Sequence, residues 1–269
     1  MKYEKVYNNW KKDPETFWLR AAEAIDWQKP PTFALDSKDP PFYEWFPDSL
    51  VNTCFNAIDR HILNGRKEQN AIIYDSPMTG KIEHITYGKL KERTALLSGA
   101  LLSKGIKKGD RVIIYMPMIP EALIGMLACA RIGAIHSVVF GGFAASELAI
   151  RIDDATPKAI LAASCGLEPG KIIPYKPLID SAIDQAKHKP DTIFMFQRPE
   201  APAELVTGRD HDWCEVQKDV KPSDCVPVEG NHPAYILYTS GTTGAPKGVV
   251  RPTAGHLVSL HWSMKNIYN

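Results

Sequence analysis

Residues 111–140 read RVIIYMPMIPEALIGMLACARIGAIHSVVF, and this stretch decides the fold. The run over 111–116 is mainly apolar and rich in β-branched residues, which predicts a strand. Pro120 suits the first turn of a helix and Gly133 suits its end, so a helix is predicted between them. A second apolar run over 135–140 predicts another strand. Strand, helix and strand in direct succession indicate a parallel pair of strands with the helix packed on the sheet.

The same alternation extends to both sides of this unit. Thr86 can cap a helix that runs to just before Gly105, and short β-rich runs separate the longer helical stretches. The further predicted strands are 71–74, 159–163, 192–196 and 234–238, and the further helices are 146–154, 178–186 and 255–268. We therefore predict the α/β fold class, with a parallel, doubly wound sheet and flanking helices.

Three regions lack this alternation. Residues 3–25 carry apolar side chains at near-helical spacing, which predicts a docked helical segment in which Pro14 suits an early helical turn. Prolines and aromatic residues alternate over 27–47, which indicates an extended, packed arm. Residues 198–231 are rich in Pro, Glu and Asp, so they are predicted to form a surface excursion.

The composition excludes several classes of partner. The net charge is +1, from 32 basic and 31 acidic residues spread along the chain, so we predict no nucleic-acid partner. No apolar run approaches the ~20 residues that cross a bilayer, and no apolar signal core follows Met1. We predict no membrane partner and a cytoplasmic location, with the mitochondrial matrix as the alternative.

The cysteines indicate neither a disulfide framework nor a zinc ribbon. They number five, are widely spaced and form no CxxC pair, which favours a reducing compartment. His211, Asp212, Cys214 and Cys225 match no standard zinc spacing, so they are interpreted as loop residues and no metal site is predicted.

A Gly- and Thr-rich segment over 239–248, TSGTTGAPKG, follows the last predicted strand. Ligands bind an open α/β sheet where strands end at their carboxyl edge. Glycines let a phosphate approach backbone N–H groups, while hydroxyls and a lysine add donors and charge. The predicted phosphate-binding residues are Thr239, Ser240, Gly241, Thr242, Thr243, Gly244 and Lys247. Gly248 stands where a Walker A loop needs Ser or Thr, so an ordinary P-loop is excluded, and the remaining alternative is a plain surface turn.

Residues 235–248, YILYTSGTTGAPKG, resemble the phosphate-loop signature of the adenylate-forming superfamily. The resemblance implies that the loop holds the phosphates of ATP while a carboxylate attacks the α-phosphorus and pyrophosphate leaves. A thiol, usually that of coenzyme A, then takes the acyl group from the acyl-adenylate. ATP, Mg²⁺ and coenzyme A are the implied cofactors and substrates.

Further motifs resemble the short-chain acyl-CoA synthetases that act on acetate and propionate. These are YNNW at 7–10, WFPD at 45–48 and VVFGGF at 138–143, while RPT at 251–253 with HWS at 261–263 is most similar to the propionate branch. The resemblance implies an amino-terminal helical and extended region over residues 1–66. Residues 67–269 would then be part of an AMP-binding domain that ends shortly after the phosphate loop.

The resemblance also implies a coenzyme A site near two segments. Gly141 and Gly142 follow a predicted strand, where small residues let a nucleotide approach the backbone, although a tight turn explains them equally well. The second segment consists of Glu168, Pro169, Gly170 and Lys171. Glu168 and Lys171 stand where acetyl-CoA synthetases place arginines, and a carboxylate there would repel phosphates.

Two arginines and two aspartates receive structural interpretations. Arg131 and Arg151 are predicted to be cations on helix surfaces, with a coenzyme contact as the alternative for Arg151. Asp153 and Asp154 are predicted to form the solvated end of a helix.

The resemblance implies that the chain corresponds to the amino-terminal portion of a longer enzyme. No catalytic residue is assigned within it, and we expect a truncated chain that is inactive alone. The alternatives are a non-catalytic nucleotide-binding fragment or interaction partner, and a module that loads a carrier-protein thiol. The expected partners are small-molecule substrates, and the sequence does not decide the oligomeric state.

Overall fold

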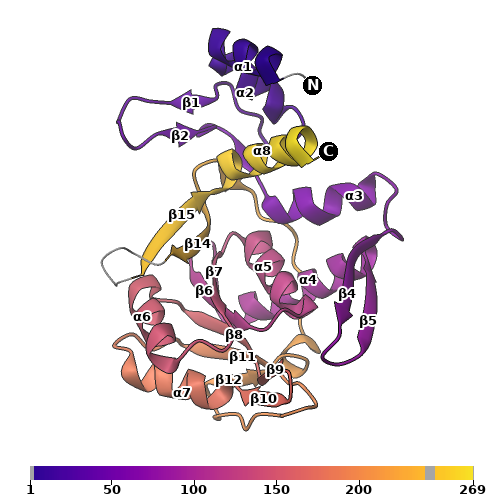
Figure 1. The fold of residues 1–269 in the computed structure, drawn as a ribbon, viewed down its shortest axis with the longest axis vertical. Coiled ribbons are helices and arrows are strands. Elements are labelled where there is room, and N and C mark those ends of the chain that lie inside the picture. The colour runs from indigo at the N-terminus through magenta and orange to yellow at the C-terminus, as the bar shows by residue number, and fades with distance from the viewer. Residues whose placement is uncertain (1–2, 240–245, 269) are drawn as a thin grey trace.

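The computed structural model describes residues 3–239 and 246–268. Within these residues the main sheet has seven strands, and helices cover both of its faces (Figure 1). From one edge to the other, the strands are β12 (Asp210–Asp212), β11 (Thr192–Phe196), β8 (Ala159–Ala163), β6 (Arg111–Met116), β7 (Ile135–Phe140), β14 (Pro233–Thr239) and β15 (Lys247–Pro252). The predicted α/β fold class with a doubly wound sheet is confirmed.

The alternation of side chains along β6 explains why helices cover both faces. Val112 and Ile114 point into a core shared with α4 (Tyr87–Ser103) and α5 (Pro120–Ile132). Ile113 points into a second core, shared with α6 (Ala145–Ala155) and α7 (Lys176–Gln185). A strand buried on both faces must be apolar at every position, which is why its sequence is continuous rather than alternating.

The predicted helix boundaries rest on capping interactions. The Thr86 hydroxyl accepts a hydrogen bond from the Lys89 N–H at 3.2 Å, so it caps α4. Pro120 begins α5, and Gly133 ends it in the left-handed conformation with φ 72°. These features confirm the central prediction.

The sheet is not wholly parallel. β15 runs antiparallel to β14, whereas all the other neighbouring pairs are parallel. β15 was not predicted from the sequence. Residues 198–231 were predicted to be a surface excursion throughout, but they include β12 and β13 (Val228–Glu229). Trp213, which follows β12, is buried against Phe196.

Two of the antiparallel strand pairs outside the main sheet bear on the sequence predictions. The predicted strand at 71–74 belongs to one of them, β4 (Asn70–Ser76) paired with β5 (Lys81–Thr86), so its expected place in the parallel sheet was wrong. The other hairpin joins β9 (Cys165–Glu168) to β10 (Lys171–Pro174) and was not predicted. Both pair locally, so they add no strand to the seven.

The amino-terminal region forms a third core with the end of the described chain. Its helices are α1 (Tyr3–Lys12) and α2 (Pro14–Ala22), because Asp13 caps a second helix where one segment was predicted. The arm contains β1 (Leu35–Asp36) and β2 (Glu44–Trp45), and β3 (Leu50–Val51) pairs with β13. Trp18 packs on Trp262 near the end of α8 (Thr253–Ser263). The labels N and C therefore lie close together in Figure 1.

Three short helical segments and one turn of α-helix complete the chain. They are η1 (Phe55–Asp59), a π-helix that runs into α3 (Arg60–Leu63), then η2 (Glu215–Gln217) and η3 (Met264–Tyr268). The predicted helix over 255–268 is thus α8 followed by a π-helical turn.

Candidate functional site

The hairpin β14–β15 forms an exposed stalk that carries the two ends of the predicted phosphate loop. Thr239 and Lys247 are directly opposite each other in the antiparallel register, and both are exposed. They bring a hydroxyl and an ammonium group to the same end of the hairpin. The predicted residues Ser240, Gly241, Thr242, Thr243 and Gly244 lie outside the described residues.

Rings on neighbouring strands attach the stalk to the sheet. Tyr235 of β14 is paired with His136 of β7, with ring centroids 5.5 Å apart, and its hydroxyl lies 3.1 Å from Nε2 of His256. Burial lowers the pKa of His136 to about 4. The imidazole is therefore neutral near pH 7, and this attachment carries no charge.

A second attachment lies one residue before Thr239. The Tyr238 hydroxyl donates a hydrogen bond to Oδ2 of Asp154 at 2.5 Å. The Arg151 guanidinium lies over the Tyr238 ring, 5.6 Å from its centroid, and pairs with Glu147 at 2.9 Å. The aromatic and polar contacts together fix the carboxyl end of β14 against α6.

These contacts correct three interpretations made from the sequence. Arg151 is buried rather than on the helix surface, and it also lies over the Phe143 ring. Asp153 and Asp154 do more than solvate a helix end, because Asp153 accepts hydrogen bonds from the N–H groups of Lys187 and His188. Helical spacing alone does not show which polar residues of a helix meet a neighbouring element.

Gly248 has a packing reason for lacking a side chain. A Cβ atom there would lie 3.1 Å from Cγ2 of Ile236 and 3.2 Å from the Tyr238 ring. Contacts that short are tighter than ordinary van der Waals packing, so a larger residue would push against the ring that anchors the stalk. The sequence places Gly248 in the phosphate-loop signature and excludes a Walker A loop by it, but does not show this packing.

Gly141 and Gly142 meet two tyrosines at the carboxyl end of β7. A Cβ atom on Gly141 would lie 2.8 Å from the Tyr175 hydroxyl, and the N–H of Gly142 donates to the Tyr115 hydroxyl at 3.2 Å. A Cβ atom on Gly166 would lie 2.2 Å from the same Tyr175 hydroxyl. Burial raises the pKa of Tyr175 to about 12, so its hydroxyl keeps its proton. Gly141 of the first predicted coenzyme A segment and Gly166, which precedes the second, thus pack against one tyrosine, whereas Gly170 of the second segment does not.

The second of those segments is the tip of the β9–β10 hairpin. Glu168 and Lys171 are paired in register and flank Pro169 and Gly170, and Gly170 has a positive φ of 71°. The tight turn requires glycine there. One carboxylate and one ammonium group at the same tip carry no net charge, so the tip alone is not an anion site.

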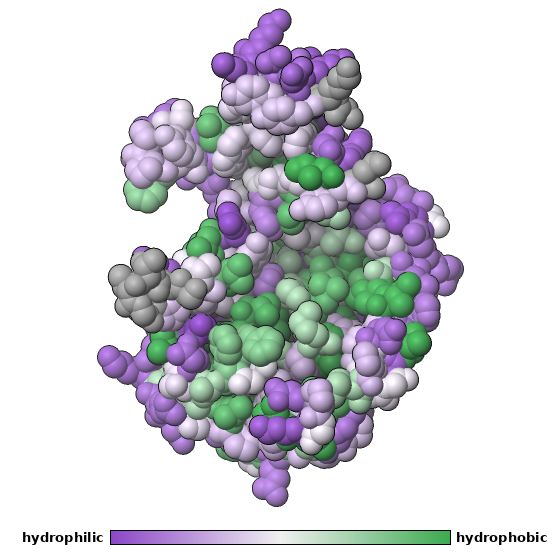
Figure 2. All heavy atoms as spheres, viewed as in Figure 1, coloured by the Kyte–Doolittle hydropathy of each residue, from purple (hydrophilic) through white to green (hydrophobic). Residues whose placement is uncertain are grey.

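Apolar side chains gather across the middle of the face seen in Figure 2, over α5 and the central strands. Met118, Phe140 and Phe143, which follow or end β6 and β7, are among the exposed apolar residues.

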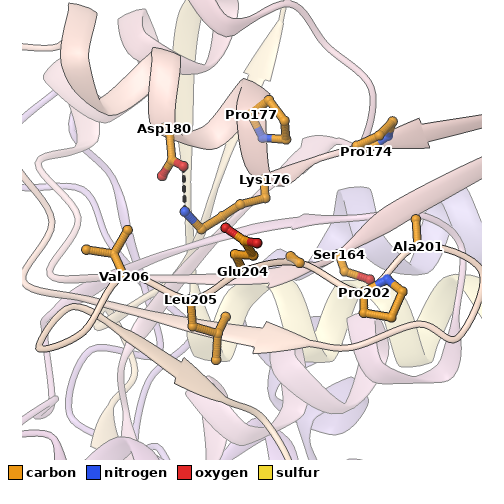
Figure 3. A pocket seen from close by; sticks show the side chains of 11 residues that line it. Ser164, Pro174, Lys176, Pro177, Asp180, Ala201, Pro202, Glu204, Leu205 and Val206 are labelled. Carbon is orange, nitrogen blue, oxygen red and sulfur yellow. Dashed lines mark hydrogen bonds and ion pairs between the residues drawn. The ribbon is translucent and has the colours of Figure 1, made fainter.

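A cavity of about 490 Å³ lies beside α7 and the segment 201–206 (Figure 3). Its lysine, Lys176, pairs with Asp180 at 2.5 Å and with Asp210 at 3.2 Å. Arg209 also pairs with Asp180 and Asp210. Because carboxylates already neutralise these cations, the cavity offers no free charge to a phosphate, and we interpret the cluster as structural.

The residues weighed as a metal site do not gather into one. Asp212 accepts hydrogen bonds from the N–H groups of Cys214 and Glu215, and His211 packs near Phe194. Cys225 instead lies beside Cys54 and Asp59, with donor atoms within 4.8 Å of one another. The sequence gives no signal for this cluster, because its members come from distant segments.

The chain is similar to two family models along almost its whole length. Residues 60–269 match the family described as "AMP-binding enzyme", and residues 3–57 match "Acetyl-coenzyme A synthetase N-terminus". Both matches agree with the resemblance found in the sequence motifs.

Curated relatives include the human protein named "Acyl-CoA synthetase short-chain family member 3, mitochondrial", which is 54% identical over 257 residues. That alignment covers 95% of this chain and 38% of the relative. "Propionate--CoA ligase" of Salmonella typhimurium is 45% identical, over 100% of this chain and 43% of its own length. The chain therefore spans about two fifths of the length of these relatives.

A solved structure has the same fold. "Acetoacetyl-CoA Synthetase from Streptomyces lividans" superposes with a TM-score of 0.85 at 24% identity, covering 95% of this chain and 39% of that one. Among the residues that the structure describes, no helix combines the length and apolar character needed to cross a membrane.

Proposed function

The chain belongs to the AMP-binding enzyme family, and from this premise we propose that it supplies the ATP-phosphate-binding part of an enzyme that joins a short-chain carboxylate to coenzyme A. The carboxylate, propionate or acetate, attacks the α-phosphorus of ATP, and pyrophosphate leaves. The coenzyme A thiol then attacks the acyl carbon, and AMP leaves. The names of the curated relatives support this acid–thiol ligase chemistry.

The observation that carries the proposal is the geometry of the stalk. Thr239 and Lys247 face each other, exposed, at the two ends of the signature segment. A hydroxyl and an ammonium group in that arrangement suit the oxygens of a polyphosphate. Tyr238 holds this end of the hairpin against α6, so the donors are positioned before the ligand arrives.

For coenzyme A, the proposal rests on the glycines rather than on charge. Gly142 has space beside its backbone for a nucleotide at the carboxyl end of β7, whereas Gly141 is packed against the Met116 carbonyl and the Tyr175 hydroxyl. Glu168 and Lys171 contribute no net charge, so the coenzyme A phosphates would need cations from elsewhere.

When bound, Mg²⁺ would neutralise negative charge on the phosphates. We assign none of this chain's side chains to it. For the compartment we propose the cytoplasm, with the mitochondrial matrix as the alternative. The name of the human relative favours the alternative.

Calorimetric titration of the purified chain with inorganic pyrophosphate and with ATP tests the phosphate site. Lys247→Met should weaken pyrophosphate binding by about tenfold to a hundredfold, because a charge-assisted hydrogen bond contributes ~1.5–3 kcal/mol. Lys187→Met is the matched control, since Lys187 is exposed beyond α7 and outside the stalk. Equal affinities for the two variants would contradict the assignment.

Turnover separates the enzyme proposal from a merely nucleotide-binding chain. Because the chain spans only 38% to 43% of its relatives, we expect the 269 residues alone to bind ATP without propionate-dependent ATP–pyrophosphate exchange. Measurable exchange would overturn that expectation. Absence of both binding and exchange would favour an interaction partner instead.

A further inference from the structure

A buried ion pair joins α5 to the π-helix η1, and the proposed function does not use it. Nη1 of Arg131 lies 2.8 Å from Oδ2 of Asp59, and Nη2 lies 3.3 Å from Oδ1. Arg131 was predicted to be on a helix surface, yet its side chain is only 2% exposed, and that of Asp59 is 8% exposed. The guanidinium also donates to the Ser223 carbonyl at 2.7 Å. Charges this deeply buried must be compensated by their immediate neighbours.

Two thiols contact this ion pair from distant parts of the chain. Sγ of Cys54 lies 3.5 Å from Nη1 of Arg131, and Sγ of Cys225 lies 3.6 Å from Oδ2 of Asp59. The two sulfur atoms are no more than 4.8 Å apart. Both thiols are free, and Cys54 immediately precedes the π-helix η1. Single π-helical turns occur frequently at functional sites.

The charges around the thiols favour one thiolate. Lys91 lies 3.0 Å from Oδ1 of Asp59, so two cations share one carboxylate. The hydrogen bond from Cys225 lowers the pKa of Cys54 and outweighs the opposing effect of burial, and Arg131 lowers it further. The same hydrogen bond raises the pKa of Cys225. Cys54 is therefore the thiol that loses its proton more readily, and Cys225 keeps its own.

Access to solvent differs between the two cysteines. Cys54 is completely buried, whereas Cys225 is partly exposed. Cys225 lies in residues 220–227, which form neither helix nor strand, and the N–H of the next residue, Val226, donates to the Arg131 carbonyl. A disulfide needs the two sulfurs, which lie within 4.8 Å of each other, to approach to about 2.05 Å.

We propose that Cys54 and Cys225 form an oxidisable dithiol, which hydroperoxides convert to a reversible intramolecular disulfide. The Cys225 thiol passes its proton to the Cys54 thiolate as its sulfur attacks one oxygen of hydrogen peroxide. The O–O bond breaks, a sulfenic acid forms on Cys225, and the released hydroxide takes the proton back from Cys54 to become water. The Cys54 thiolate then attacks the Cys225 sulfur, the S–O bond breaks, and the hydroxide takes a proton from solvent to become a second water. Each sulfur loses one electron, and the peroxide gains two.

A metal ion fits this cluster less well. Both carboxylate oxygens of Asp59 already face cations, at 2.8 Å from Arg131 and at 3.0 Å from Lys91. Only the two sulfurs would remain as ligands, fewer than the four of a structural zinc site. The neighbouring positive charges would also repel a divalent cation.

Peptide mapping of the purified chain after stepwise addition of hydrogen peroxide tests the proposal without any substitution. The expected product is one cross-linked pair of peptides containing Cys54 and Cys225, with the loss of two thiols per chain and full recovery with dithiothreitol. Cys214, exposed and without a thiol neighbour among the described residues, is the internal control and should stay alkylatable at the same peroxide concentration.

Two variants distinguish the roles of the sulfurs. Cys54→Ser should leave a stable sulfenic acid on Cys225, which dimedone traps. Cys225→Ser should react at least tenfold more slowly, because the buried Cys54 then faces the peroxide alone. Cys214→Ser should oxidise like the parent chain.

Either of two results would overturn the proposal. The first is oxidation that begins at Cys214 while Cys54 and Cys225 remain free thiols in the unmodified sequence. The second is a Cd²⁺–thiolate absorption band that needs Cys54, Cys225 and Asp59 together, which would assign the cluster to a metal.

Discussion

Strands β8 and β14 belong to one sheet but have opposite surroundings. All residues of β8 are buried between helices on both faces, whereas β14 is only partly covered and its partner β15 is exposed from Lys247 to Arg251. β8 is held by parallel neighbours on both sides, and β15 forms an antiparallel edge. The centre of the sheet therefore depends on apolar packing, and the stalk depends on a few directed contacts.

This difference separates stability from binding. A change in the two-sided centre should lower the free energy of unfolding of the whole chain. A change in the stalk should alter phosphate binding while leaving the fold almost as stable. Exposed edges carry function because neighbouring layers do not constrain their side chains.

The largest effect is expected from the buried ion pair between Asp59 and Arg131. Asp59→Asn leaves Arg131 buried without its counter-charge and should lower the free energy of unfolding by about 3–5 kcal/mol at pH 7, measured by urea denaturation. Glu92→Gln is the control, because its pair with Lys89 is 57% exposed on both sides and should contribute about 0.5 kcal/mol or less.

The same pair predicts the acid sensitivity of the fold. Burial acts to raise the pKa of Asp59, but hydrogen bonds from Arg131 and Lys91 outweigh it and hold that pKa below its usual value. The stabilisation is thus present above the unfolded pKa of about 3.9 and is lost as pH falls through the lower folded value. Asp59→Asn should not show this loss of stability in acid. If the free energies of unfolding of the two proteins fall in parallel as pH falls, Asp59 is not the cause of the acid sensitivity.

The next prediction compares a Leu→Ala substitution in β8 with the same substitution in β14. Leu161→Ala in β8 removes a completely buried side chain and should cost about 2–5 kcal/mol. Leu237→Ala in β14 removes a side chain that is 47% exposed and should change stability by about 0.5 kcal/mol or less. Urea unfolding midpoints of the two variants measure the contrast, which fails if their losses are equal.

A smaller effect is expected at the stalk. Tyr238→Phe removes the hydrogen bond to Asp154, which contributes about 0.5–1.5 kcal/mol, so β14 and β15 amides should exchange faster while β6 amides do not. Pyrophosphate affinity should fall several-fold. Tyr74→Phe in β4 is the matched control, and a uniform rise in exchange for Tyr238→Phe would mean that the stalk and centre open together.

The smallest effect on stability is expected at the tip of the β9–β10 hairpin. Glu168→Lys replaces an exposed residue and should change the free energy of unfolding by about 0.5 kcal/mol or less. Because the tip then carries two cations, coenzyme A should bind several-fold more tightly in a competition assay. Unchanged affinity with an intact fold would show that the tip does not face the coenzyme.

Local sequence signals predicted the centre well and the edge poorly. The strands at 111–116, 135–140, 159–163 and 192–196 have the predicted bounds, because continuous apolar runs between caps leave little choice. β15 was missed because a short segment ending in Pro252 has no pattern of its own, and its pairing is supplied by β14. The same holds for β12, whose three residues form a strand only beside β11.

The candidate site was also predicted only in part. The signature segment can be recognised directly in the sequence, and the family resemblance places Thr239 and Lys247 at its ends. The contacts of Tyr238 with Asp154 and of Tyr175 with Gly141 join residues far apart in the sequence, so no local sequence pattern predicts them. Arg131 was misjudged for this reason, since only Asp59 explains why a helix buries a cation.

The third core has a consequence for the chain as it leaves the ribosome. Trp18 of α2 packs on Trp262, and β3 has its partner in β13, so segments that are made early pack against segments that are made much later. Until residues 253–263 are synthesised, Trp18 has Trp45 as a neighbour but lacks the cover of α8. We expect general chaperones to bind this segment during translation and to release it when α8 arrives.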